Sequence, residues 1–170
     1  MRPHVLSTYA ESLGVARSLV HDVPCARFAE LPHPGAKHPG WVLGHLCVAS
    51  GLAAATLGDD PSEMQTLCGV PPLMAGGTAP GTEPLPERAA YATKESLLAE
   101  LDRVHALTVE RFDAASDERL AAEFPVAEYR DFWPTVGAAA FYLMARHEQY
   151  HLGQLSMWRR AAGLPAASPA

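Results

Sequence analysis

Cysteine is scarce in this 170-residue sequence, which contains only Cys25, Cys47 and Cys68. An odd number of cysteines cannot all pair within one chain, and none of them forms a CxxC. We therefore expect no disulfide framework and a reducing compartment, most simply the cytoplasm. Cys47 is expected to act as a small core hydrophobe, and nothing near Cys25 or Cys68 indicates an activated nucleophile.

An excess of positive charge is also lacking. The chain has 13 Lys and Arg against 19 Asp and Glu, a formal net charge of −6 and a pI of about 5.7. The basic residues are scattered, and the one adjacent pair, Arg159-Arg160, lies near an expected helix end, where cations favour the helix dipole. Because no global positive field would attract phosphate backbones, we expect no nucleic-acid partner.

Long hydrophobic runs are few. The segment MRPHVLSTYAESLG has no apolar stretch of the kind that a secretory signal requires, so we expect no such signal. The segment from Trp41 to Leu57 has about 17 residues, the lower limit for crossing a bilayer, and it contains His45 and several small residues. We expect a buried helix of a bundle here rather than a membrane span.

Alternation of apolar and polar residues is nowhere long enough to predict a β-strand. Apolar residues instead recur at every third or fourth position in four segments, which is the spacing of one helix face. The predicted helices run from about residue 6 to before Pro24, from Pro39 to about Leu57, from a Thr93 cap to near Ala115, and from a Thr135 cap to Gly163. We therefore predict an all-α fold, a four-helix bundle formed by a single domain over residues 1–170.

The segments between these helices are rich in proline and glycine. One of them contains LPHPGAKHPG, and residues 59–86 contain GVPPLMAGGTAPG without any sustained periodicity. Long loops of this kind often border functional sites. They also permit a crossover connection instead of simple up-and-down order, and the periodicity does not decide between the two.

The last predicted helix carries His147 and His151, four positions apart. Residues at this spacing share one helix face, so both imidazoles can reach the same ion. They fall in the apolar stripe with Leu143 and Leu155, and both rings are therefore expected to point into the bundle. A shared divalent metal offsets the cost of burying two polar rings better than the alternative, two core histidines held by hydrogen bonds.

The letters HEQYH also match HExxH, the metalloprotease signature in which the glutamate is the general base. A zincin site needs a third ligand downstream, but no His, Asp, Glu or Cys follows His151, so that site cannot be completed. Glu148 keeps two interpretations, a proton carrier beside the metal ligands or a solvent-facing residue about 100° around the helix from His147. Gln154 and Tyr150 are weaker candidates for orienting the ligands.

The third metal ligand must then come from upstream. His45 is the best candidate because an unpaired imidazole would be costly on its otherwise apolar helix, although a core histidine bonded to a backbone carbonyl is the alternative. His105 is the rival, but its charged neighbours favour an exposed or boundary position. His33 and His38 lie in a Pro/Gly-rich loop and reach the site only if that loop folds back.

Two segments, HPGWVLGHL and HEQYHLGQLSMWRRAAGLP, resemble the DinB-like superfamily, which includes thiol-dependent S-transferases and mycothiol-dependent maleylpyruvate isomerases. The spacing between the segments also fits, and the resemblance extends over nearly the whole chain. It implies a four-helix bundle with a histidine triad at His45, His147 and His151. It further implies a homodimer formed through helices of the bundle, and it implies no DNA polymerase activity.

Three neutral imidazoles leave coordination positions open, as at catalytic rather than structural sites. We therefore expect a metal-dependent enzyme, a transferase or isomerase that activates a low-molecular-weight thiol toward a small-molecule substrate. A hydrolase that uses a bound hydroxide, and a protein that binds metal or a small ligand without catalysis, are the alternatives. Histidine ligands suit Zn²⁺, Ni²⁺, Fe²⁺ and Cu²⁺, so the sequence leaves the identity of the metal open.

Overall fold

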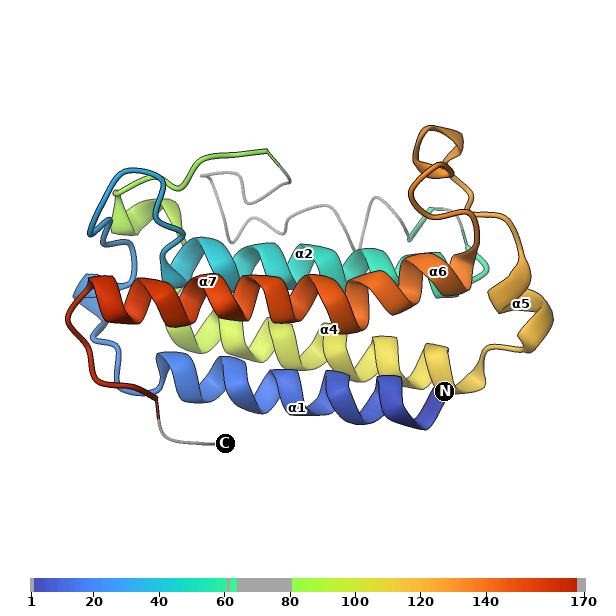
Figure 1. Ribbon diagram of the computed structural model, residues 1–170, viewed down its shortest axis with the longest axis horizontal. Coiled ribbons are helices and arrows are strands. Elements are labelled where there is room, and N and C mark those ends of the chain that lie inside the picture. Colours follow the sequence, from blue (N-terminus) through green and yellow to red (C-terminus); the bar gives the residue numbers. More distant parts are fainter. Residues whose placement is uncertain (1, 61, 64–80, 168–170) are drawn as a thin grey trace.

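The computed structural model describes residues 2–60, 62–63 and 81–167. Four long helical segments lie side by side in it (Figure 1). They are α1 (Arg2–Val20), α2 (Pro39–Leu57), α4 (Lys94–Ala114) and a continuous run of α6 (Val136–Phe141), the π-helical η4 (Tyr142–His147) and α7 (Glu148–Ala161). Across the described residues no strand is present, only an isolated bridge between Glu123 and Thr135. The predicted all-α fold is confirmed.

Short elements occupy the connections. They are η1 (Cys25–Arg27), η2 (Arg88–Ala90), α5 (Asp117–Ala121) and η3 (Ala127–Tyr129). The periodicity of the sequence did not predict α5, whose N-cap, Ser116, accepts a hydrogen bond from the backbone N–H of Arg119. The middle of the predicted 59–86 loop, with Cys68, lies outside the described residues.

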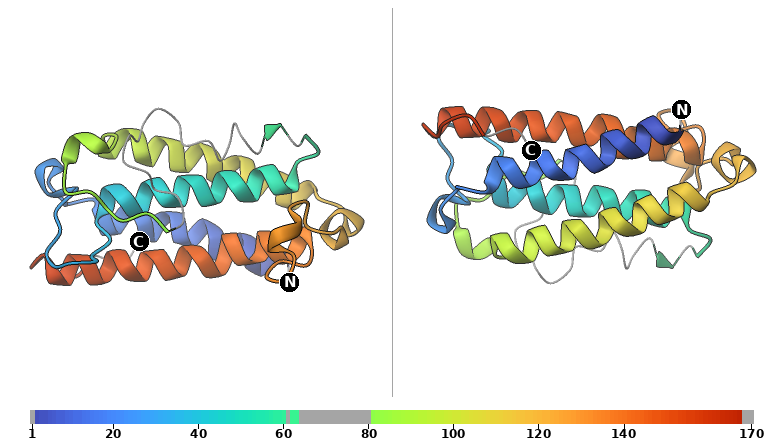
Figure 2. Two further views of the ribbon diagram at one scale, coloured as in Figure 1. Left: turned by 90° about the horizontal axis from the view of Figure 1, so that it is seen from above. Right: turned by 90° about the horizontal axis from the view of Figure 1, so that it is seen from below.

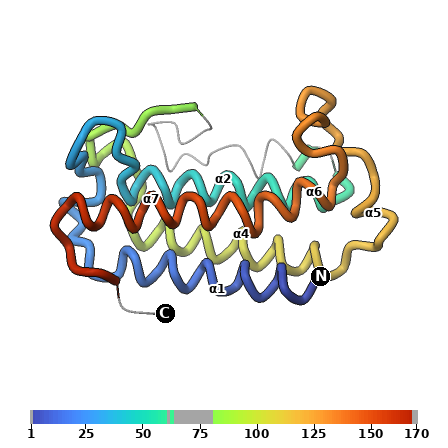
Figure 3. Tube along the Cα trace, in the orientation of Figure 1, coloured from blue at the N-terminus to red at the C-terminus, as the bar shows by residue number. Residues whose placement is uncertain are grey.

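The long helices do not simply alternate in direction. The chain runs one way along α1, back along α2, the same way as α2 along α4, and back again along α6 and α7 (Figures 1 and 3). Both views of Figure 2 show the same order, and α2 packs mainly on α4 while α1 packs mainly on α7. The connection between α2 and α4 is therefore a crossover that returns to the end of the bundle where α2 begins.

Helix α2 is the most buried element of the bundle. Of its 19 residues, 17 are buried, and many of these are Gly, Ala or Ser, whose small side chains allow close helix packing. It is long and apolar enough to cross a membrane, with a mean hydropathy of 1.5, but 89% of that stretch is buried inside the protein. Burial within the bundle thus explains a composition that also resembles a membrane span.

The ends of the helices follow ordinary capping chemistry. The side chains of Thr93 and Thr135 accept hydrogen bonds from the first turns of α4 and α6, as predicted. Pro39 begins α2 as predicted, and the preceding residue, His38, caps that helix with Nδ1, which accepts from the backbone N–H of Trp41 at 3.2 Å. These caps fix where each helix starts.

The core consists of two apolar clusters along the bundle axis, and α2 contributes to both, with Leu46 in one and Ala49 in the other. Buried Arg159 fastens α7 to the end of α1 by donating to the carbonyl oxygen of Leu19 at 2.8 Å and to Asp22 at 2.5 Å. His45 lies on α2 directly before Leu46. Helix α2 also packs on α7, so the ring of His45 can face α7.

The π-helical segment η4 interrupts the last helix immediately before α7. A π turn carries an additional residue per turn, so it changes the angular position of everything that follows, and such turns are frequent at functional sites. The sequence periodicity predicted one uninterrupted helix here. In the structure His147 is the last residue of η4 and His151 lies one turn further on, in α7.

Candidate metal centre

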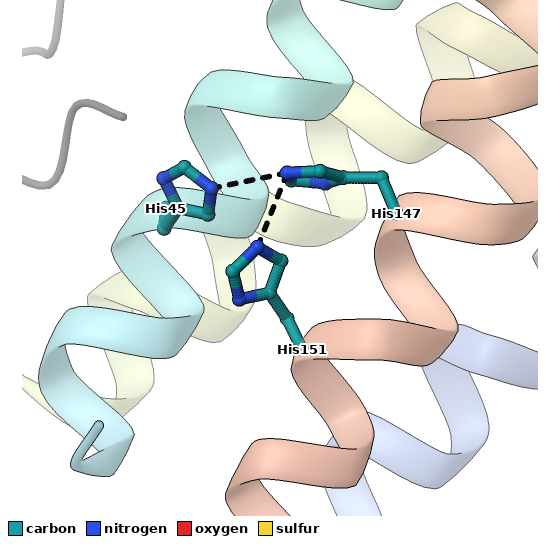
Figure 4. Close-up of side chains that lie close together, drawn as sticks. All are labelled: His45, His147 and His151. Carbon is teal, nitrogen blue, oxygen red and sulfur yellow. Dashed lines mark hydrogen bonds between the residues drawn. The ribbon is translucent and has the colours of Figure 1, made fainter. Parts of the chain in front are cut away.

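The three histidines singled out in the sequence come together between α2 and α7 (Figure 4). Nε2 of His147 lies 3.1 Å from Nε2 of His45 and 3.1 Å from Nε2 of His151. One nitrogen from each ring falls within a group whose members are all less than 4.8 Å apart. Residues 102 positions apart in the sequence thus present their ring nitrogens to a single point.

The orientation of His151 is set by a neighbour on its own helix. Its Nδ1 lies 2.8 Å from the side-chain oxygen of Gln154. Because an amide oxygen only accepts, Nδ1 of His151 carries the proton and Nε2 presents a lone pair toward the other two rings. This is the tautomer that metal binding through Nε2 requires, and ligating histidines usually have such a partner on the far nitrogen.

The environment of the triad favours neutral imidazoles. Burial, followed by repulsion from His151 and His45, lowers the pKa of His147 to about 3. Burial and repulsion from His45 also lower the pKa of His151, to about 4, although the hydrogen bond that His151 donates to Gln154 acts in the opposite direction. Both rings are therefore uncharged near pH 7, and neutral imidazole is the form that binds metal.

Aromatic and cationic side chains surround the triad. The indole of Trp41 stacks on the ring of His45, with centroids 4.7 Å apart and an angle of 15° between the planes. The ammonium group of Lys37 lies 4.7 Å from the centroid of the Trp41 ring, and the indole N–H donates to the hydroxyl of Thr82 at 3.2 Å. The exposed ring of Tyr150 packs edge-on against His151. This shell restricts how the rings of His45 and His151 can turn.

Glu148 follows His147 directly, yet its carboxylate is directed toward α1 and α4. It is only 2% exposed and accepts a hydrogen bond from Nε2 of His105 at 2.6 Å, and Ser12 contacts its other oxygen. The interpretation of Glu148 as a solvent-facing residue is therefore wrong. Its role as a proton carrier stays a prediction.

His105 is not at the boundary of the protein, as its charged neighbours had suggested. It is 3% exposed and stacks on the ring of Tyr9, with centroids 3.8 Å apart and planes within 6°. The polar residues beside it in the sequence misled the prediction because they point to solvent while the ring of His105 points into the bundle. No local signal in the sequence pairs His105 with Glu148, because the two residues face each other only once α4 and α7 are packed together.

The loop histidines and the cysteines take other roles. His38 is buried as the cap of α2, and its Nε2 donates to the carbonyl oxygen of Leu85 at 2.9 Å, while His33 is exposed and contacts the carbonyl oxygen of Pro34. Neither belongs to the group formed by the triad. Cys47 is buried, as predicted, and burial raises the pKa of its thiol far above the usual range, whereas Cys25 is exposed.

The residues of the triad fit a divalent metal ion. Two nitrogens bound to one ion at about 2.0–2.1 Å each are at most about 4.2 Å apart, and the observed separations of 3.1 Å lie within that limit. Nε2 of His147 faces two other nitrogens but carries at most one proton, and its buried Nδ1 has no hydrogen-bond partner among the described residues. An ion shared by the three lone pairs would stabilise this arrangement, whereas hydrogen bonds alone leave part of it unsatisfied.

A family model described as the DinB superfamily matches residues 8–155, which include all three histidines of the triad and most of the bundle. Neither curated proteins nor solved structures gave a match to the chain.

Proposed function

The chain belongs to the DinB superfamily, and from this membership and its three-histidine group we propose that it is a metal-dependent enzyme whose ion is held by His45, His147 and His151. The observation that carries the proposal is the convergence of three imidazoles from helices that the sequence separates widely, with the rings of His147 and His151 held neutral by burial. Three protein ligands leave coordination positions for a substrate, as catalytic sites do. Zn²⁺, Ni²⁺ and Fe²⁺ all suit such ligands.

The reaction we propose is the transfer or isomerisation of a small molecule with a low-molecular-weight thiol as co-substrate. A bound divalent ion supplies Lewis acidity and lowers the pKa of a coordinated thiol or water. Within the described residues no cysteine provides this group at the triad, because Cys47 is buried with its Sγ directed to the carbonyl oxygen of Leu97 and Cys25 is not part of the group formed by the triad. An external thiol therefore fits the site better than Cys47 as a nucleophile.

The remaining residues of the site hold and shield the ligands. Gln154 keeps the proton of His151 on Nδ1, and Trp41 covers one face of His45. A surface cavity of about 440 Å³ is lined by Gln154, Lys37 and Tyr150 but by none of the three histidines, and its volume lies within the size range of small-molecule sites. The ammonium group of Lys37 at its edge suits an anionic group of a thiol or acceptor, although Glu83 also pairs with this lysine.

The first experiment concerns the metal itself. Protein purified without a nickel column and analysed for its elements is expected to carry close to one divalent ion per chain. His151→Ala is expected to lose that ion, and His4→Ala, which removes an exposed histidine of α1, is expected to keep it. Equal metal content in the two variants would contradict the assignment of the triad.

The second experiment concerns the reaction. Metal-loaded protein is assayed with bacillithiol, mycothiol or glutathione and a panel of electrophiles, and we expect thiol-dependent turnover that His151→Ala abolishes. Turnover of esters or amides without any thiol would instead identify a hydrolase. Metal binding without turnover in either assay would indicate a binding protein and would refute the proposed activity.

Location and assembly belong to the same proposal. Among the described cysteines, Cys25 and Cys47 are free, which supports a reducing compartment such as the cytoplasm. We also propose a homodimer, as the resemblance of the sequence to this family implies. Light scattering coupled to size-exclusion chromatography tests this, and a monomer at micromolar concentration would contradict it.

A further inference from the structure

A polar cluster lies in the core beside the triad, on the side of α7 that faces α1 and α4. It consists of Glu148 on α7, His105 on α4, and Ser12 and Tyr9 on α1, which we call the core polar cluster. Glu148 is 2% exposed, His105 is 3% exposed, Ser12 is 1% exposed and Tyr9 is fully buried. Moving these polar groups out of water costs free energy, so their burial in the core calls for a compensating role.

Each oxygen of the Glu148 carboxylate is held from a different helix. Oε1 accepts from Nε2 of His105 at 2.6 Å, and Oε2 is in contact with the hydroxyl of Ser12. The ring of Tyr9 stacks on His105 and limits how that imidazole can turn. Two anchors on two helices fix a side chain in rotation as well as in position, which one hydrogen bond does not achieve.

The position of Glu148 in the chain makes this restraint matter to the triad. It is the first residue of α7, directly after the π-helical η4, next to His147 and three residues before His151. Successive residues of a helix point about 100° apart, so fixing the direction of Glu148 also fixes the directions of His147 and His151 about the helix axis. A carboxylate fixed toward α1 and α4 therefore holds the two imidazoles toward α2.

The tolerance of a metal site shows why rotation must be restrained. A rotation of α7 by about 20° would move a side-chain tip about 5 Å from the helix axis by roughly 2 Å. Metal–ligand distances tolerate only about 0.2 Å. The hydrophobic contacts of α7 are non-directional and do not by themselves set its rotation this closely.

We propose that Glu148, His105 and Ser12 are positioning residues, which set the rotation of α7 after the π turn and so align His147 and His151 with His45. The inference rests on the proposed metal site and goes beyond it, because none of the three residues touches the ion. It gives the buried carboxylate a role other than proton transfer.

The test measures metal affinity and ligand geometry separately from stability. Apo-protein is titrated with Co²⁺, whose visible absorption reports both the dissociation constant and the arrangement of ligands, and the melting temperature of each apo-variant is recorded. His105→Ala removes one anchor from α4 without altering α7. We expect it to weaken Co²⁺ binding by about tenfold or more, as loss of residues that orient ligands typically does, and to change the absorption bands.

Two further variants separate positioning from stability. His105→Gln keeps a donor toward Glu148 and is expected to restore most of the affinity and the wild-type spectrum. The matched control is Asp22→Asn, which weakens another polar anchor of α7, the bond of Arg159 to Asp22 just beyond the end of α1. We expect this control to lower the melting temperature and to leave the Co²⁺ affinity and spectrum unchanged.

The outcomes are distinguishable. Wild-type protein that binds no Co²⁺ refutes the proposed metal site, and the positioning role falls with it. Wild-type affinity and spectrum in folded His105→Ala overturn the positioning role alone. If His105→Ala does not fold, Ser12→Ala removes the smaller anchor, and an unchanged spectrum and affinity in that variant overturn the proposal in the same way.

Discussion

His147 is the residue whose surroundings most favour a bound cation. Its Nε2 faces Nε2 of both His45 and His151 at 3.1 Å, and its buried Nδ1 has no partner in the described part of the chain. A side chain with these contacts loses water on folding and recovers only part of its hydrogen bonding. Nε2 of His147 can form a hydrogen bond with only one of the two facing nitrogens, whereas a metal ion would bind the lone pairs of all three rings. His147, the central ring, is therefore the residue whose substitution best distinguishes a metal site from a set of core histidines.

The role of Gln154 can be tested at this scale. Gln154→Ala removes the acceptor that keeps the proton of His151 on Nδ1, so we expect metal affinity to fall by about 10–100-fold. Calorimetric titration of apo-protein with Zn²⁺ measures the change. Gln149→Ala, at an exposed position of the same helix, is the control and should bind Zn²⁺ like the wild type; equal affinity in both variants would argue against the orienting role.

The lowered pKa values of His147 and His151 predict a dependence of apo-protein stability on pH. Below about pH 6.5 the unfolded chain takes up protons on these residues, while the folded chain stays neutral there until pH approaches about 4 for His151 and about 3 for His147. The free energy of unfolding is thus expected to be highest above pH 6.5 and to fall as pH decreases from there toward 4.

Chemical denaturation in metal-free buffer between pH 7 and pH 4 measures this dependence. The double variant His147→Gln, His151→Gln lacks both titrating groups, and its stability should fall less steeply with decreasing pH than that of the wild type. Because the carboxylates of the two proteins are the same, their contribution cancels in the comparison. Parallel curves would show that the two imidazoles are not held neutral by the fold.

At the scale of the elements, local signals in the sequence predicted most helix boundaries. Pro39 at the start of α2 and the caps Thr93 and Thr135 act through neighbouring backbone groups, and the structure confirms each of them. The short helix α5 and the π-helical η4 were missed. A π turn has no residue requirement of its own, and it arises because the segments on either side of it must both face the core.

Two glycines on the last helical run give a matched pair of substitutions. A Cβ at Gly137 in α6 would lie 2.9 Å from the carbonyl oxygen of Leu120, so Gly137→Ala must displace α5 from α6. We expect it to lower the free energy of unfolding by about 1–3 kcal/mol. A Cβ at Gly153 in α7 would meet open space, so Gly153→Ala should raise the free energy of unfolding by about 0.5–1 kcal/mol through helix propensity.

Urea denaturation of the two variants checks this prediction. Opposite signs are expected, and the metal content of both proteins should match that of the wild type because neither substitution touches a ligand. A stabilising Gly137→Ala would mean that α5 packs less closely on α6 than the structure indicates.

At the scale of the whole molecule, we expect the fold to form without the metal. Two apolar clusters extend along the bundle, and Arg159 and the caps secure the helices independently of the triad. Removal of the ion with a chelator is therefore expected to leave the far-ultraviolet circular dichroism unchanged.

The same chelated protein should nevertheless be less stable. An ion present at about 100 times its dissociation constant contributes about 2.7 kcal/mol to the free energy of unfolding, provided that it binds only the folded state. Calorimetric scans with and without chelator measure the resulting fall in melting temperature. Loss of the helical circular dichroism signal on chelation would mean that the protein needs the metal to fold, as small metal-dependent domains do. That result would contradict the expectation that the two apolar clusters hold the bundle together without the ion.

The sequence by itself determined the all-α class, the extent of α2 and α4, and the residues that converge at the candidate metal centre. These features depend on spacing along one helix, on caps a few residues away, and on the cost of placing an imidazole such as His45 in an apolar stretch. Each can be read within a short window of the chain.

Only the tertiary structure decided the parallel arrangement of α2 and α4, the burial of His105 and the direction of Glu148. These features depend on which helix lies opposite which, and residues 43 positions apart, such as His105 and Glu148, carry no local sign that they will meet. The side of a helix that becomes interior is set by its neighbours, so polar residues that pair across helices are recognised only when both helices are in place.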